Sequence, residues 1–207
     1  MKSLILLSLI IFGPAAAQPV LHLQLGLSPR TSSIIPFESG NSLNNSWKDG
    51  WSAALSTEFP IHKDISLSPG IEYNHYPFDN LFSQVTVPEV SLRYSSGDAA
   101  YIYRFFLEVK LFDSRIDRLS FCLLTGINYD IEKYGEINAV FSDMNGPDFK
   151  IVYPSRTYYY WMHSIGAGLR YFFSCGYGFD LTAKLYTDYD KRSQTALQLG
   201  FLAKLEL

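Results

Sequence analysis

Apolar and polar side chains alternate along segment after segment of this 207-residue chain. The alternation is clearest at 195–207, where Leu197, Leu199 and Phe201 occupy odd positions while Gln198 and Lys204 occupy even ones. A period of two places successive side chains on opposite faces of a β-strand. The C-terminal segment is therefore predicted to be a strand with one apolar face and one polar face.

The same pattern predicts eight strands in all, and they share one phase. Their ranges are 21–28, 51–59, 65–74, 101–111, 119–130, 159–173, 179–189 and 195–207. In each range the odd positions are mostly apolar, and the even positions carry charges, hydroxyl groups and glycine. We therefore expect an all-β protein.

Alternation alone fits a soluble sandwich as well as a membrane barrel, and the aromatic residues favour the barrel. One end of the strands carries Trp51, Tyr73, Tyr101, Tyr103, Tyr129, Tyr159, Trp161 and Tyr189. The other end carries Phe59, Phe121, Tyr171, Phe173 and Phe179. Two aromatic bands bounding an aliphatic belt are typical of the interfacial girdles of transmembrane barrels. We predict an eight-stranded antiparallel up-and-down transmembrane barrel.

The N-terminal segment is predicted to be a signal peptide. Lys2 precedes an apolar run at 4–12, Gly13-Pro14 interrupts that run, and 15–17 are three alanines. This arrangement is typical of an export signal with a cleavage site before Gln18, and it is too short for a spanning helix. We expect residues 1–17 to be the signal and 18–207 the barrel domain. No apolar run after residue 17 reaches eighteen residues, so membrane insertion is expected to use strands.

The predicted connections alternate between short and long. The short ones are 60–64, 113–118 and 174–178, and the long ones are 28–50, 77–100 and 132–156, with a shorter last one at 190–194. Outer-membrane barrels place short turns at the periplasm and long loops outside. The segment 83–94 also resembles a strand, but its phase changes at Pro88, so we assign it to an extramembrane hairpin or loop extension. A ten-stranded barrel, in which this segment pairs with part of 136–153, is the alternative.

The second half of the chain resembles a known family. Residues 106–131, the glycine-containing segment 164–173 and the segment 178–186 are similar to strand units of the small outer-membrane β-barrel proteins of Bacteroidetes, often called PorT-like. The resemblance implies a barrel that the outer-membrane assembly machinery inserts. It implies no catalytic residues.

The even-numbered residues are predicted to fill the barrel interior. An eight-stranded barrel is just wide enough for its own side chains, so no aqueous pore is expected. The interior set contains both signs of charge: Glu58, Glu72, Arg104, Glu108, Lys110, Asp130, Arg170, Asp180, Lys184 and Asp188. Buried ions must pair because an unpaired one costs several kcal/mol. We expect ion pairs around Arg104 and Arg170 with glutamate partners; a binding cavity or proton-linked site is the alternative.

His163 is the one candidate for catalytic chemistry. In outer-membrane lipid A deacylases a histidine and a serine two positions later share the lipid-facing surface, but here that position is Ile165 and Ser164 is predicted to point inward. A nucleophile must lie within hydrogen-bonding reach of its base. We therefore expect no catalytic, metal-binding or cofactor-binding residues. Cys122 and Cys175 are placed near adjacent strands, where a disulfide is geometrically conceivable.

The sequence thus predicts a non-enzymatic integral outer-membrane barrel with a structural, surface-binding or envelope role. Its expected partners are outer-membrane lipid, the assembly machinery during insertion, and a surface or periplasmic partner that the sequence does not identify. A formal net charge of −3 gives no indication of a nucleic-acid partner. Two alternatives stay open: a lipid-modifying enzyme that uses His163, and an accessory barrel of a secretion or assembly apparatus.

Overall fold

The computed structural model describes residues 18–29, 35–36, 42–43, 49–78, 90–116, 118–143, 146–188 and 193–205. Within them lie β1 (Val20–Ser28), β2 (Ile35–Pro36), β3 (Ser42–Leu43), β4 (Gly50–His62), β5 (Ile65–Tyr76), β6 (Val90–Gly97), β7 (Ala100–Ile116), β8 (Leu119–Tyr134), β9 (Ile137–Asp143), β10 (Phe149–Tyr153), β11 (Arg156–Phe172), β12 (Tyr177–Thr187) and β13 (Ser193–Lys204). The predicted signal peptide lies outside the described residues. No helix among the described residues is long and apolar enough to cross a membrane.

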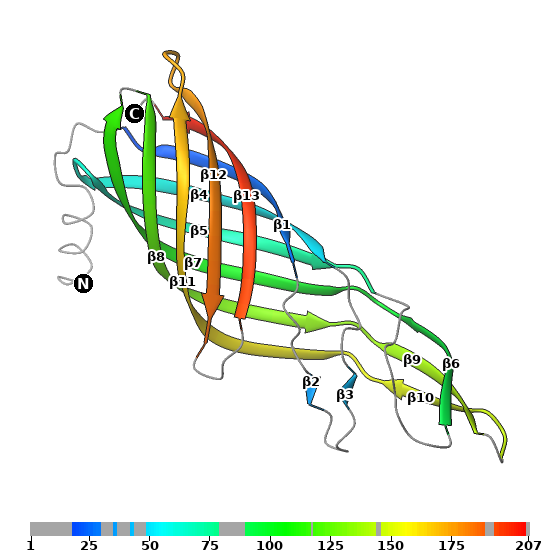
Figure 1. The fold of residues 1–207 in the computed structure, drawn as a ribbon. Coiled ribbons are helices and arrows are strands. Elements are labelled where there is room, and N and C mark those ends of the chain that lie inside the picture. The colour runs from blue at the N-terminus through cyan, green and yellow to red at the C-terminus, as the bar shows by residue number, and fades with distance from the viewer. Residues whose placement is uncertain are drawn as a thin grey trace, which may run out of the picture.

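Eight of these strands close into one barrel. Their order is β1-β13-β12-β11-β8-β7-β5-β4, and β4 pairs with β1 to complete the ring. Every pair is antiparallel, and consecutive barrel strands are neighbours, which is up-and-down topology. The eight predicted strands are these eight, so the predicted fold class is confirmed. Figure 1 shows the last strand, β13, lying beside the first, β1.

The polarity of the barrel is inverted relative to a water-soluble protein. Leu25, Leu199 and Trp161 on the outer surface are 60%, 59% and 63% exposed. Arg104, Glu108 and Asn128 are 1% exposed or less in the interior. Because side chains alternate along a strand, the odd-numbered apolar set faces out and the even-numbered polar set faces in on all eight strands.

The two ends of the barrel differ. The connections 62–65, 116–119 and 172–177 are short, and they define what we call the turn end. The opposite end, the loop end, carries the longer connections 28–50, 76–100 and 134–156. In Figure 1 the sheet formed by β6, β9 and β10 projects from the loop end, away from the turns.

This projecting sheet continues three barrel strands beyond the barrel. Its order β10-β9-β6 repeats the order β11-β8-β7 of the wall below it. The pairs break near Asp98, Gly135 and Pro154, where the Asp98 N–H still donates to the Glu136 carbonyl at 3.0 Å. Proline lacks a ladder donor and glycine weakens a strand, which accounts for the break. The sheet is thus an extension of one side of the wall.

The projecting sheet corrects two sequence-based expectations. The sequence predicts a connection over 132–156, but β8 extends to Tyr134 and both β9 and β10 lie within this region. The ten-stranded alternative is wrong: Val90–Gly97 does pair with Ile137–Asp143, but outside the closed barrel. Neighbouring strands can continue to pair beyond the barrel without adding a strand to the ring. The strands β6, β9 and β10 therefore lengthen the wall. Residues 83–89, including Pro88, lie outside the described residues.

A small apolar core lies where the projecting sheet meets the barrel. This loop-end cluster consists of the buried residues Tyr76, Ala100, Ile102, Tyr134 and Ile137, against which Phe78, Tyr153 and Tyr158 pack. Burial raises the pKa of Tyr153 in the projecting sheet. The cluster thus places buried apolar side chains of neighbouring strands at the loop end of the barrel.

Candidate functional site: the charged lumen

The predicted interior charges all lie in the lumen and are buried, with one exception. The eight residues named for a lumen charge network are between 1% and 6% exposed: Glu58, Glu72, Arg104, Glu108, Lys110, Arg170, Asp180 and Lys184. Each comes from an even position of a barrel strand, so the alternation of the strand points it inward. Asp130 joins them and is fully buried, whereas Asp188 is only half-buried beyond the end of β12.

Arg104 is the centre of the group nearest the loop end. Its Nε and Nη2 donate to both carboxylate oxygens of Asp130 at 2.9 and 2.7 Å, and its Nη1 donates to Glu72 at 3.0 Å. The centre of the Tyr186 ring lies 3.5 Å from the guanidinium carbon. A two-pronged pair of this kind fixes the guanidinium plane as well as its charge.

A single ion pair occupies the middle of the lumen. The Lys184 Nζ donates to Glu108 at 2.6 Å, and both side chains are 1% exposed. The ammonium also lies 4.9 Å from the centre of the Phe106 ring. The apolar interior side chains therefore pack against the charged ones and exclude water from this pair.

Arg170 is the centre of the group nearest the turn end. Its Nη1 and Nη2 donate to the two oxygens of Glu58 at 3.0 and 2.8 Å. Lys110 reaches the same carboxylate at 3.5 Å, and the Nε2 of His22 lies 3.3 Å from it. The other ring nitrogen of His22 lies 3.6 Å from Asp180. These side chains connect the strands β1, β4, β7, β11 and β12 through the lumen.

A glycine makes room for Asp180 in this group. A Cβ added at Gly200 would collide with the Asp180 Oδ1. The missing side chain of β13 thus lets the carboxylate of β12 lie over the neighbouring strand.

The prediction from sequence omitted the neutral members of the network. Gln194 accepts from Arg104 at 2.7 Å and donates to Ser28 and Tyr76. Glu72 accepts from its neutral donors at 2.9 to 3.0 Å, and these donors are Asn74, Tyr186 and Gln198. All three donors occupy even positions of predicted strands, so the parity that identified the ions could have identified them as well.

A further carboxylate lies in the lumen at the loop end. Glu132 accepts from the hydroxyls of Tyr134 and Tyr160. The sequence places Glu132 at the start of a predicted connection, whereas β8 continues to Tyr134. The missed extension of this strand is the reason that the sequence did not assign Glu132 to the interior.

The aromatic residues predicted as girdles lie on the outer surface. Trp51 contacts Tyr73, Tyr73 contacts Tyr101 and Tyr103, and Tyr129 contacts Trp161, with ring centres 5.1 to 6.0 Å apart. At the turn end a second chain of ring contacts joins Tyr171, Phe173, Phe179, Phe201 and Tyr177. Tyr159 is 63% exposed. Tyr189 lies outside the described residues.

His163 and Ser164 do not form a catalytic pair. His163 is exposed on the outer surface, whereas Ser164 is fully buried and points into the lumen. The two side chains lie on opposite faces of β11, so the histidine cannot activate the serine. Cys122 is buried and Cys175 is exposed, and both are free thiols, so the conceivable disulfide is absent. Among the described residues no group of three His, Cys, Asp or Glu is arranged to hold a metal ion.

The fold and the lumen together define a class of structure, a closed eight-stranded antiparallel barrel with an apolar exterior and a paired, charged interior. No family model matches the chain. No curated protein matches it by sequence.

Solved structures resemble the chain in fold. A major outer membrane protein from Thermus thermophilus is 8% identical with a TM-score of 0.52, over 92% of this chain and 100% of that one. Neisserial surface protein A is 14% identical with a TM-score of 0.49, and the match covers 90% of this chain and 96% of that one. The attachment invasion locus protein of Yersinia pestis is 11% identical with a TM-score of 0.47, and the match covers 90% of this chain and 98% of that one. Identities this low concern the fold alone.

Proposed function

We propose that this chain is an integral outer-membrane protein with a closed lumen and a non-enzymatic structural or surface-binding role. The observation that carries the proposal is the inverted polarity of the barrel. Leu25 and Leu199 are 60% and 59% exposed, and Arg104 is 1% exposed. In water this arrangement would expose the apolar surface and bury the ions, whereas in a bilayer both sets are satisfied.

The height of the outer apolar band supports the same proposal. Trp161 and Tyr171 on β11 belong to the two aromatic bands and stand ten residues apart. At about 3.3 Å per residue and a strand tilt of about 40°, this separation spans roughly 25 Å along the barrel axis. The apolar band of an outer-membrane barrel is about 25 Å tall. The resemblance of residues 106–131, 164–173 and 178–186 to PorT-like barrels adds to this support.

A closed lumen follows from how the interior is filled. The ion pairs of Lys184 and Arg170 cross the lumen between non-adjacent strands, the ion pairs of Arg104 join neighbouring strands along the wall, and the loop-end cluster adds buried apolar side chains at the loop end. Eight strands leave room for side chains and not for an aqueous channel. The protein is therefore proposed to seal its own interior.

The surface-binding part of the proposal rests on the projecting sheet. With the turn end at the periplasm, the sheet β10-β9-β6 stands on the cell surface. On β10, Phe149, Ile151 and Val152 are 40%, 36% and 47% exposed, and β10 pairs with β9 alone among the described strands. Exposed apolar residues on an edge strand are typical of a surface that contacts another molecule.

Envelope fractionation tests the membrane location. The full-length chain, expressed in a Gram-negative host, should sediment with the outer membrane and stay there after a carbonate wash. A gel run without boiling should show a faster folded band that slows on heating, because a closed barrel resists detergent until it is heated. Recovery of the folded chain in the soluble periplasmic fraction would overturn the proposal.

Planar-bilayer recording tests the closed lumen separately. The purified chain should produce no steady current, and Lys184→Met should not open one, because the other interior side chains and the loop-end cluster remain in an eight-stranded barrel. A large constant current from the wild-type chain would contradict a sealed interior while leaving the membrane location intact.

A further inference from the structure

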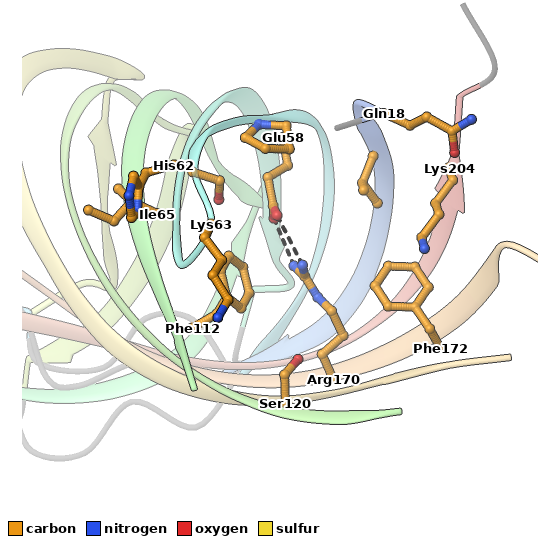
Figure 2. A pocket seen from close by; sticks show the side chains of 13 residues that line it. Gln18, Glu58, His62, Lys63, Ile65, Phe112, Ser120, Arg170, Phe172 and Lys204 are labelled. Atoms are coloured by element: carbon orange, nitrogen blue, oxygen red, sulfur yellow. Dashed lines mark hydrogen bonds and ion pairs between the residues drawn. The ribbon is translucent and has the colours of Figure 1, made fainter. Parts of the chain in front are cut away.

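The turn end of the barrel contains a cavity that the proposed function does not use. Its volume is about 650 Å³, and it opens among the short connections of the barrel. Ligand pockets for small molecules range from about 300 to 1,000 Å³. Figure 2 shows Lys63 and Lys204 on opposite sides of this opening, with Arg170 and Glu58 joined between them.

The cavity lining carries more cations than carboxylates. Lys63, Arg170 and Lys204 bring three cations, and Glu58 is the one carboxylate among the lining residues. Glu58 is already engaged, because Arg170 donates to both of its oxygens at 3.0 and 2.8 Å and Lys110 approaches at 3.5 Å. In the part of the chain that the structure describes, Lys63 and Lys204 form no ion pair with a carboxylate. The described lining residues therefore carry a net positive charge.

Two buried polar groups in the cavity lining have no hydrogen-bond partner among the described residues. They are the Nε of Arg170 and the Oγ of Ser66, in side chains whose residues are 6% and 2% exposed. A buried donor without an acceptor costs about 1–3 kcal/mol. Both atoms belong to residues that line the same cavity as the two lysines. The two atoms themselves are shielded from the cavity, so the groups open to an occupant are the two lysines and the rings.

The remaining lining is apolar and partly aromatic. The centres of the Phe112 and Phe172 rings lie 4.5 and 5.8 Å from the Arg170 guanidinium carbon, and the Lys204 Nζ lies 4.9 Å from the centre of the Phe172 ring. The apolar part is completed by Val20, Pro60 and Ile65. Rings placed beside cations provide a surface for an apolar or aromatic body whose anionic group faces the cations.

We propose that this cavity binds a small water-soluble organic anion, a phosphate or carboxylate group carried on an apolar or aromatic body. Lys63 and Lys204 hold the anionic group, Phe112 and Phe172 contact the body, and the Arg170–Glu58 pair closes the inner end of the cavity. The cavity lies inside the barrel wall, since Glu58 and Arg170 are lumen residues, so the occupant enters from the aqueous side of the turn end. This goes beyond the proposed function, which assigns no ligand.

Calorimetric titration of the full chain in an uncharged maltoside detergent tests the proposal. Phenyl phosphate is the probe. Phenol and inorganic phosphate, titrated separately, report the contributions of its aromatic ring and of its anionic group. Phenyl phosphate should bind at one site and more tightly than either. The double variant Lys63→Gln, Lys204→Gln should weaken its binding at least tenfold, because both lysines are exposed cations of the site. Lys133→Gln, a change to an exposed lysine near the other end, should leave it unchanged.

A second variant tests the apolar part of the site. Phe172→Leu should weaken phenyl phosphate several-fold and leave inorganic phosphate unaffected. Absence of saturable phenyl phosphate binding would overturn the proposal, and so would binding that the lysine double variant does not change. Equal affinity for inorganic and phenyl phosphate would refute the aromatic contact. Heat-modifiable migration of each variant shows that the barrel is folded, so these failures stay distinct from failure of the membrane proposal.

Discussion

Single residues in the lumen matter mainly through their partners. Arg104 is held by Asp130, Glu72 and Gln194, and Arg170 is held by Glu58. Burial removes the water that would otherwise solvate these ions, so each carboxylate depends on its cation. Removing one member of an ion pair leaves the other charge buried without a partner. Removing both charges changes only the packing of the side chains.

The Lys184 and Glu108 pair offers the simplest test at this scale. Lys184→Met should lower the free energy of unfolding by about 3–5 kcal/mol, because Glu108 stays buried and charged. The double variant Glu108→Gln, Lys184→Met should recover at least half of that loss. Urea unfolding in lipid vesicles, followed by tryptophan fluorescence, measures both.

The matched control is Lys133→Met on the outer surface. This lysine is exposed, and its ammonium lies 5.3 Å from the centre of the Tyr103 ring, a contact worth about 0.5–1 kcal/mol at an exposed site. A loss for Lys184→Met no larger than for this control would mean that the lumen pair is solvated.

At the scale of elements, each barrel strand has one face for hydrocarbon and one for the polar lumen. β13 illustrates this, with Leu197, Leu199 and Phe201 outward at 42% to 59% exposure and Gln198 fully buried. The strand continues in register against β1 on one side and β12 on the other. A charge placed on the outward face is therefore expected to cost an amount that depends on its depth in the membrane.

Leu199→Arg should cost about 2–4 kcal/mol of unfolding free energy in lipid vesicles, because it places a cation near the middle of the apolar band. Ala203→Arg, four residues nearer the turn end on the same face, should cost about 0–1 kcal/mol. Urea titration of the two refolded variants gives the comparison. Similar costs at the two depths would argue that no bilayer surrounds this face.

The projecting sheet is expected to be separable from the barrel. Ile137 is 3% exposed and joins β9 to the loop-end cluster, so Ile137→Ser removes apolar contacts without breaking a barrel pair. Limited proteolysis of intact cells should cut this variant faster between 137 and 153, while the heat-modifiable band is retained. Loss of that band would show that the sheet and the barrel fold as one unit.

For the whole molecule, closure is the decisive feature. The first strand pairs with the last, Leu21 opposite Ala203, so the barrel has no free edge among its eight strands. Closure removes unpaired backbone groups that a bilayer could not satisfy. It also encloses the ion pairs, because a cylinder has an interior only when its sheet is complete.

A disulfide across this junction tests the closure and its register. Leu21→Cys with Ala203→Cys, made with Cys122→Ala and Cys175→Ser, should oxidise to one intramolecular bridge, since paired residues have suitable Cβ separations. Leu21→Cys with Leu199→Cys should not, because position 199 lies roughly 13 Å further along β13. Gel mobility with and without reductant reports the bridge. Equal bridging in both variants would show that the register slides.

Much of the barrel could be predicted from local sequence. Leu197, Leu199 and Phe201 at odd positions, repeated in phase through eight segments, predict the strands and the two faces of each. The inward placement of Arg104 and Arg170 follows from the same parity. The strand at 90–97 is harder to assign, because it lengthens the wall instead of joining the ring, and no local pattern distinguishes these two outcomes.

The sequence by itself determined which residues share a face, because a strand's period of two depends only on local geometry. Only the tertiary structure decided which partners meet. Arg170 and Glu58 are 112 residues apart in the chain, and closure with a particular register brings them to 2.8 Å. The cavity at the turn end is likewise a product of closure, since Lys63 and Lys204 come from different turns and strands. Distances across a cylinder depend on strand number and stagger, which are properties of the whole sheet.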